Sequence, residues 1–284
     1  MTRWSYLPGL ALTIVAALLL GFLANLVLMG RLQHARDQKV AYADVRKEFA
    51  NATAPVGPVD EGGRLLALGR PVAVLQIPQL GLREVVFEGT TAGVLASGPG
   101  HRRDTVLPGQ SGTSVIMGRR AAFGGPFADL TGLIRGDVFQ VYTGQGPTAH
   151  DYRVLGVRFA GDPAPPALTA GQGRLTLLTA DGPAFFPSGL VRVDAELISR
   201  VQPTPRRAVT PAMLAGSEKA LAGDPDEWIG IVLFGQALLL IAGAMMWARM
   251  RWGRRQAWLA GAPILIGLGI AVADRAAYLL PNLM

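Results

Sequence analysis

The sequence of 284 residues contains no cysteine. This absence excludes disulfides, a thiolate nucleophile on this chain, and every zinc or iron–sulfur site that needs cysteine ligands. Charge is also scarce, because 17% of the residues are charged while 50% are hydrophobic, and the mean hydropathy is +0.32. Such a composition is too apolar for a disordered chain and for an ordinary soluble domain. We expect one globular domain accompanied by membrane segments.

Histidine is rare as well, with only His34, His101 and His150. None of them has a second histidine or a carboxylate at the spacing of a metal site. The glycines at Gly124 and Gly125 lack the lysine that a phosphate-binding loop requires. We therefore expect no metal and no cofactor, and we expect His101, in a Gly-Pro-Gly-His loop, to make a structural hydrogen bond.

The positive net charge of +7 does not come from the expected globular region. Residues 72–199 contain ten arginines and ten acidic residues, so this stretch is neutral. A nucleic-acid-binding domain needs a basic face. We exclude nucleic acid as a partner and attribute the charge to linkers and membrane flanks.

Three apolar runs predict membrane spans: Leu7–Met29, Ile229–Ala248 and Ala257–Ala273. The first is long enough to cross ~30 Å of hydrocarbon. It exceeds the usual ~7–15-residue core of a signal peptide, and no small-x-small cleavage site follows it, so we interpret it as an uncleaved anchor.

Arginines set the expected orientation of these spans. Arg249, Arg251, Arg254 and Arg255 lie between the second and third runs. Because clustered positive charge marks the cytoplasmic side, this loop and the N-terminus are expected in the cytoplasm. Residues 30–228 are then expected outside it.

The composition predicts seven segments along the chain. They are an N-terminal transmembrane anchor (1–30), a helical and Pro/Gly-rich linker (31–71), a β domain (72–199), a second linker (200–228), a transmembrane helix (229–248), a cytoplasmic arginine loop (249–256) and a third transmembrane helix (257–280).

Short runs rich in β-branched residues, each bounded by Gly, Pro or Asp, predict the strands of the β domain. They are Val72–Ile77, Glu84–Phe87, Thr113–Met117, Asp137–Tyr142, Asp151–Phe159, Arg174–Thr179 and Leu190–Ile198. So many short strands favour a barrel or a sandwich. Phe127–Ile134 is the expected helical turn.

Five motifs in this region resemble those of a sortase domain, and their layout is closest to class E sortases of actinobacteria. In chain order they are Ile77–Leu82 with Val85–Gly89 (I-P-x-I-x-L…V-x-E-G), Gly98–His101 with Leu107–Gly112 (G-P-G-H-Y…L-P-G-x-x-G), Ser114–Arg120 with Phe123–Phe127 (V-I-A-G-H-R…Y-G-x-P-F), Leu130–Asp137 (L-x-x-L-x-x-G-D) and Arg174–Thr179 (R-L-T-L-x-T-C). The resemblance covers about residues 72–199. It implies a closed sortase-like barrel of about eight strands with short helices.

The resemblance also implies where catalytic residues would fall. Sortases are extracytoplasmic transpeptidases that use a cysteine, a histidine and an arginine. In this sequence the cysteine position holds Ala180 and the histidine position holds Arg119. The arginine position holds Leu190, with Arg192 two residues further on. A methyl group cannot attack a carbonyl, and arginine stays protonated near neutral pH.

From these substitutions we expect a membrane-anchored pseudoenzyme, not an enzyme, that serves as a binding or assembly module for envelope or surface proteins. Its partner is expected to be an active sortase, a protein bearing a sorting signal, or membrane subunits. The candidate groove residues are His101, Arg119, Arg120, Asp181, Phe185, Phe186 and Arg192. The candidate walls are the loops Ala160–Gly173 and Asp181–Gly189.

Three alternatives stay open at this point. The C-terminal helical hairpin is a candidate scaffold for a membrane complex. A hydrolase of different chemistry, using Asp181 or His101, is another candidate. Arg119 and Arg120 have two candidate partners, a carboxylate of another protein or Asp129 of this chain.

Overall fold

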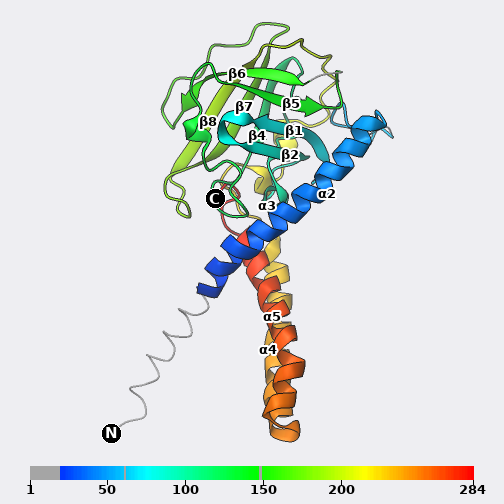
Figure 1. The fold of residues 1–284 in the computed structure, drawn as a ribbon, viewed down its shortest axis with the longest axis vertical. Helices are drawn as coiled ribbons and strands as arrows, with labels where there is room; N and C mark the ends of the chain where they lie inside the picture. Colours follow the sequence, from blue (N-terminus) through cyan, green and yellow to red (C-terminus); the bar gives the residue numbers. More distant parts are fainter. Residues whose placement is uncertain (1–19, 61, 147–148) are drawn as a thin grey trace. The chain divides into compact units, whose positions relative to one another are not determined.

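The computed structural model describes residues 20–60, 62–146 and 149–284. The chain divides into two compact units. One unit contains Pro225–Leu279 together with the chain up to Gly30, and the other contains Arg31–Asp224 together with Leu280–Met284. The last residues of the chain therefore belong to the same unit as the β domain (Figure 1).

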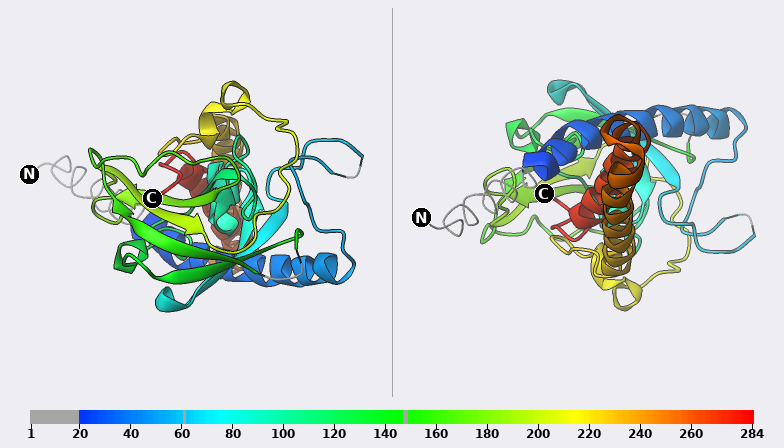
Figure 2. Two further views of the ribbon diagram at one scale, coloured as in Figure 1. Left: turned by 90° about the horizontal axis from the view of Figure 1, so that it is seen from above. Right: turned by 90° about the horizontal axis from the view of Figure 1, so that it is seen from below.

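Eight strands form a closed barrel in the order β1-β2-β3-β4-β7-β8-β6-β5 (Figures 1 and 2). Their bounds are β1 (Pro71–Ile77), β2 (Leu82–Glu88), β3 (Gly100–His101), β4 (Gly112–Met117), β5 (Val138–Thr143), β6 (His150–Arg158), β7 (Gly173–Asp181) and β8 (Gly189–Leu197). The pairs β2–β3 and β4–β7 are parallel, and the other pairs are antiparallel. This confirms the expected barrel.

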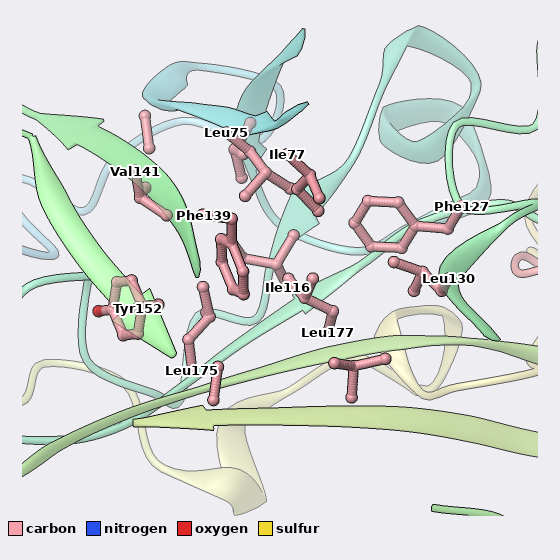
Figure 3. Packing of buried hydrophobic residues seen from close by; sticks show 14 of the residues in the cluster. Leu75, Ile77, Ile116, Phe127, Leu130, Phe139, Val141, Tyr152, Leu175 and Leu177 are labelled. Carbon is pink, nitrogen blue, oxygen red and sulfur yellow. The ribbon is translucent and has the colours of Figure 1, made fainter. Parts of the chain in front are cut away.

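The core fills the inside of the barrel with side chains from alternate strand positions (Figure 3). Leu75, Ile116 and Leu177 are fully buried there. Phe139 and Tyr152 stack with their ring centroids 5.8 Å apart. Each buried side chain of this size contributes about 1.5–3 kcal/mol of hydrophobic free energy. Because side chains alternate between the two faces of a strand, the neighbouring positions of the same strands point out of the barrel.

Helix α2 (Gly30–Ala50) covers β1 and β2. Ala41 and Val45 pack with Val85 and Phe87 in a second buried cluster. The Gln38 side chain donates to the Val85 carbonyl at 3.1 Å and accepts from the Val85 N–H at 2.7 Å. The amide of Gln38 thus satisfies main-chain groups of β2 at an edge of the sheet.

The remaining helical elements of this unit are short. They are α3 (Ala92–Ser97), η3 (Pro78–Leu80), η4 (Leu130–Gly132), η5 (Pro211–Met213) and η6 (Gly216–Glu218). Only three residues of the expected turn Phe127–Ile134 are helical, and they form the 3₁₀ element η4.

The second unit contains the helices α4 (Glu227–Trp252) and α5 (Arg254–Tyr278), which lie side by side (Figures 1 and 2). Glu227–Ala248 and Gly261–Tyr278 are long and apolar enough to cross a membrane. The chain turns at Gly253, whose φ of 98° favours glycine. The expected arginine loop 249–256 is therefore wrong in its local structure, because these arginines lie on the ends of two helices.

The expected first span falls mostly outside the described residues. Residues 7–19 of Leu7–Met29 lie there, whereas residues 20–24 are helical and continue into the π-helix η2 (Asn25–Met29).

Polar groups of this unit are paired with one another. Arg275 forms an ion pair with Glu227 at 2.7 Å, and Asn25 donates to Asp274 at 2.9 Å. A Cβ added at Gly261 would collide with the Met245 side chain, so the two helices approach each other closely at this glycine. Small residues allow such close helix packing.

Candidate peptide groove

The outer face of β4, β7 and β8 carries the positions that the sequence motifs single out. In the ladder Met117 pairs with Leu178, which pairs with Arg192, while Ala180 pairs with Leu190. Directly paired residues share a face of the sheet. Their chain neighbours Ile116, Leu177 and Val193 are fully buried inside the barrel. The face is formed by Val115, Met117, Thr176, Leu178, Ala180, Leu190 and Arg192.

Other parts of the same unit cover this face. Leu283 packs with Leu95, Met117, Leu178 and Ala180 in one buried cluster. Ala220 and Leu221, from the linker before α4, pack against the same cluster. We call this face, together with the cleft beneath its cover, the groove.

Ala180 lies near the end of β7, where it is 2% exposed. Its carbonyl accepts a hydrogen bond from the Arg120 side chain at 3.1 Å. Arg120 also lies 3.6 Å from a carboxylate oxygen of Asp181. Of the carboxylates of this chain, Asp181 and not the candidate Asp129 forms the ion pair with Arg120.

Arg119 is buried completely, although arginine is rarely buried. Its guanidinium donates to the Ala92 carbonyl at 2.9 Å and lies 4.7 Å from the centre of the Phe123 ring. A carbonyl and an aromatic face both favour a cation. The side chain thus lies within the fold, where solvent does not reach it.

A cavity of about 210 Å³ remains beside the covered part of the groove. Arg102, Arg192 and Lys219 contribute basic side chains to its lining, and Leu178 and Leu190 contribute apolar ones. Asp104 neutralises Arg102 at 2.7 Å. The remaining positive charge of Arg192 and Lys219 favours an anionic group.

The structure separates His101 from this face. His101 pairs with Ile116, which points into the barrel, and is 2% exposed. Its Nδ1 lies 2.9 Å from a Glu88 carboxylate oxygen, and its Nε2 lies 3.0 Å from the Val106 carbonyl. Burial lowers the pKa of His101, but Glu88, Val106 and Asp104 outweigh burial and raise that pKa above its ordinary value.

The two candidate wall loops lie largely at the surface. In the β7–β8 loop, Phe186 is 77% exposed, while Phe185 is half-buried. Asp181 begins this loop and accepts a hydrogen bond from the Gly182 N–H at 2.8 Å. Most of the residues of Ala160–Gly173 are exposed.

Across the residues that the structure describes, no group of three His, Cys, Asp or Glu side chains could hold a metal ion. The segment Leu280–Met284 belongs to none of the sequence motifs, and its first residue falls in the expected third transmembrane helix, 257–280. Only the contacts of Leu283 place this segment at the groove.

Comparison with known proteins identifies the barrel. The family model of the Sortase domain matches residues 75–188. This match identifies the barrel as a sortase domain, as the motifs predicted. No curated protein matches the chain.

Solved structures of sortases are similar to the chain. Sortase E from Streptomyces avermitilis is 30% identical, with 52% of this chain and 100% of that chain covered and a TM-score of 0.41. A sortase D5 transpeptidase from Clostridium perfringens is 20% identical, with 58% and 99% covered and a TM-score of 0.46. SrtF sortase from Corynebacterium diphtheriae is 25% identical, with 58% and 99% covered and a TM-score of 0.42.

The expectation that this chain is not an enzyme is wrong. The matched domain family is one of transpeptidases, and that match points to an enzyme. A missing cysteine is a property of the sequence and not positive evidence for the absence of activity.

Proposed function

We propose that this protein is a membrane-anchored, extracytoplasmic sortase-family protein that binds an extended peptide segment of an envelope or surface protein in the groove. The observation that carries this proposal is the groove itself, in which a peptide segment already packs on Leu178 and Ala180. A transpeptidase has to bind an extended peptide before it reacts with it, and the residues of the groove support this binding step directly.

The charge of the cavity beside the groove supports a particular kind of peptide. Arg192 and Lys219 line it with positive charge next to apolar Leu178 and Leu190. A segment that combines apolar side chains with a carboxylate is complementary to such a lining. Phe186, which is exposed in the neighbouring loop, offers an apolar contact at the rim.

The path of the chain supports the expected topology. The chain leaves the barrel unit after Asp224 and returns to it at Leu280. Between these points lie α4 and α5, each long enough to cross a membrane. Two crossings return the chain to its starting side, so the barrel and Leu280–Met284 are compatible with one side of the membrane. Clustered arginines mark the cytoplasmic side of a membrane. The arginines between α4 and α5 therefore favour the extracytoplasmic side for the barrel and for Leu280–Met284.

Site-specific cross-linking tests the proposal in native membranes. Because the chain has no cysteine, Leu190→Cys supplies a single thiol in the groove for a photo-cross-linker, and Arg153→Cys supplies one on a half-exposed side chain of β6. We expect Leu190→Cys, but not Arg153→Cys, to cross-link to one peptide segment of an envelope or surface protein. Addition of Arg192→Ala or Phe186→Ala is expected to reduce the yield. Equal products from both thiols contradict the proposal.

A second function, as a scaffold subunit of a membrane complex, has one supporting observation. The tight contact at Gly261 and the ion pair Arg275–Glu227 hold α4 against α5 as a defined hairpin. Removal of the barrel would leave the partners of such a scaffold unchanged. Co-purification of the same membrane subunits with and without the barrel, and no cross-link from Leu190→Cys, would favour this function.

A further inference from the structure

We infer that the segment Leu280–Met284 is a built-in peptide ligand of the groove, and that a partner displaces it by offering the same side-chain pair, an amide followed by a leucine. This inference rests on the proposed function, because it names the class of peptide that the same groove takes.

The main chain of this segment is held as a bound peptide is held. The Arg120 N–H donates to the Leu283 carbonyl at 3.0 Å, and the Ala122 N–H donates to the Met284 main-chain oxygen at 3.3 Å. Both donors belong to the stretch that follows β4. Every residue type offers a main-chain carbonyl to such donors, so these bonds give affinity without specificity. The segment itself turns, because the Met284 N–H donates to the Pro281 carbonyl at 3.0 Å.

The leucine pocket gives the first element of specificity. Leu283 is fully buried against Leu95, Met117, Leu178 and Ala180. The small side chain of Ala180 forms part of the pocket wall. A larger side chain in place of Leu283 would overfill this pocket. A charged side chain would lose its hydration there.

The amide subsite gives the second element. Asn282 is fully buried, and its side-chain nitrogen donates to the Thr90 carbonyl at 2.8 Å and to the Lys219 carbonyl at 3.0 Å. The Asn282 N–H donates to the Ala222 carbonyl at 2.9 Å. These carbonyl acceptors favour the N–H groups of a neutral amide, which a carboxylate lacks.

The other part of the cover, the linker before α4, is held to the barrel by a buried ion pair. Glu218, in the linker, is fully buried and forms a double hydrogen bond with Arg103 at 2.8 and 2.9 Å. The Thr90 hydroxyl donates to the Glu218 carbonyl at 2.6 Å. The linker therefore forms a fixed wall that presents the Lys219 and Ala222 carbonyls to Leu280–Met284.

Accessibility of a single thiol tests the inference in the full-length protein in detergent micelles. Ala180→Cys places the only thiol of the chain beneath Leu283. We expect maleimide to react at least about tenfold faster when Leu283→Asp is added, because a buried carboxylate expels the segment. Asn282→Ala is a second, milder way to release it. Ile134→Cys, on a side chain that is 67% exposed, is the control and should react at the same rate in every background.

Addition of a peptide in trans tests the specificity. In the Leu283→Asp background, the synthetic peptide Leu-Pro-Asn-Leu-Met should slow the labelling of Ala180→Cys back toward the native rate. Leu-Pro-Asn-Asp-Met and Leu-Pro-Asp-Leu-Met should not protect the thiol. Equal labelling with and without the native segment overturns the inference, as does an open groove that the matching peptide fails to protect.

The two proposals fail in different ways. Cross-linking of an envelope protein from Leu190→Cys without protection by the synthetic peptide keeps the proposed function and overturns the inferred ligand. Protection by the synthetic peptide without any cross-linked partner supports the inferred ligand and counts against the proposed function.

Discussion

Leu283 packs against Ala180 on the outer face of the barrel, where the two residues are 0% and 2% exposed. The position that the sequence motifs predict for the sortase cysteine is thus covered by a residue more than a hundred positions later in the chain. A partner has to displace Leu283 before it can reach Ala180. The stability of the Leu283–Ala180 contact therefore sets how readily the groove opens.

Replacement of Leu283 tests the energetic weight of this contact. Leu283→Ala removes a fully buried side chain and should lower the stability of the barrel unit by about 2–5 kcal/mol. Thermal unfolding of the full-length protein in detergent measures the effect. The control is Ile134→Ala, at a side chain that is 67% exposed, which should change stability by less than about 0.5 kcal/mol. Similar losses for both variants would show that Leu283 does not stabilise the barrel.

The linker ion pair gives a second prediction. Glu218→Gln leaves Arg103 without a carboxylate partner. The Glu218 side chain is fully buried but that of Arg103 is 17% exposed, so water compensates in part, and we expect a loss of about 2 kcal/mol. Glu196→Gln breaks the exposed pair with Arg153 and should cost less than about 1 kcal/mol. Denaturant unfolding compares the two, and an equal cost would count against the fixed wall.

Protonation of His101 should make the stability of the protein depend on pH. Burial lowers the pKa of His101 in the folded protein, but the Glu88 carboxylate outweighs burial and raises that pKa above its ordinary value of 6.5. The folded state then retains a proton that the unfolded state has released. The stabilisation is complete below pH 6.5 and is lost as the pH rises through the raised pKa.

The measurement is the melting temperature as a function of pH for the native protein and for His101→Gln. The variant should lose the decline above pH 6.5. Burial lowers the pKa of His150, which instead reduces stability as the pH falls below 6.5. The window above 6.5 therefore isolates His101, and an unchanged decline in His101→Gln would refute the assignment.

Replacement of Gly109 should lower the stability of the barrel strongly. Its φ of 91° favours glycine, and an added Cβ would lie 2.5 Å from His150 Nε2. Its N–H also donates to the buried Tyr152 hydroxyl at 2.6 Å. Gly109→Ala should therefore cost clearly more than the ~1 kcal/mol of backbone strain alone.

The matched control for this substitution is Gly136→Ala. Gly136 has a φ of 99°, but an added Cβ would meet nothing within 4 Å. The difference in melting temperature between the two variants isolates the collision with His150. No difference would mean that the His150 ring moves aside freely.

The proposed orientation predicts which thiols an impermeant reagent reaches. Ser188 lies exposed in the β7–β8 loop, and Gln256 lies exposed between the two membrane segments. In intact cells a membrane-impermeant maleimide should label Ser188→Cys but not Gln256→Cys, and permeabilised cells should show both. The reverse pattern would place the barrel in the cytoplasm.

Much of the barrel was predictable from the sequence. Each of the seven predicted strand runs overlaps one of β1, β2, β4, β5, β6, β7 and β8, with Asp137, Phe159 and Ile198 one residue outside, because short β-branched stretches between turn residues encode a strand locally. β3, with only Gly100 and His101, escaped because two residues have no periodicity. The five motifs also predicted the sortase family, which the domain match confirms.

The candidate site was less predictable. Arg119 and His101 stand at motif positions, yet the structure buries Arg119 on Ala92 and Phe123 and directs His101 to Glu88. Motif spacing states where a residue lies along a strand. It does not state whether the side chain reaches solvent, which depends on the layers packed around it.

The sequence by itself determined the strands, the apolar helices, and the absence of a thiol, because each is a local or compositional property. Only the tertiary structure decided that Leu280–Met284 covers the groove. Leu283 and Ala180 are far apart in the chain, and the bonds from the Arg120 and Ala122 N–H groups involve main-chain atoms that every residue type shares. No local pattern encodes a contact that forms only once the barrel has closed and the chain has returned to it.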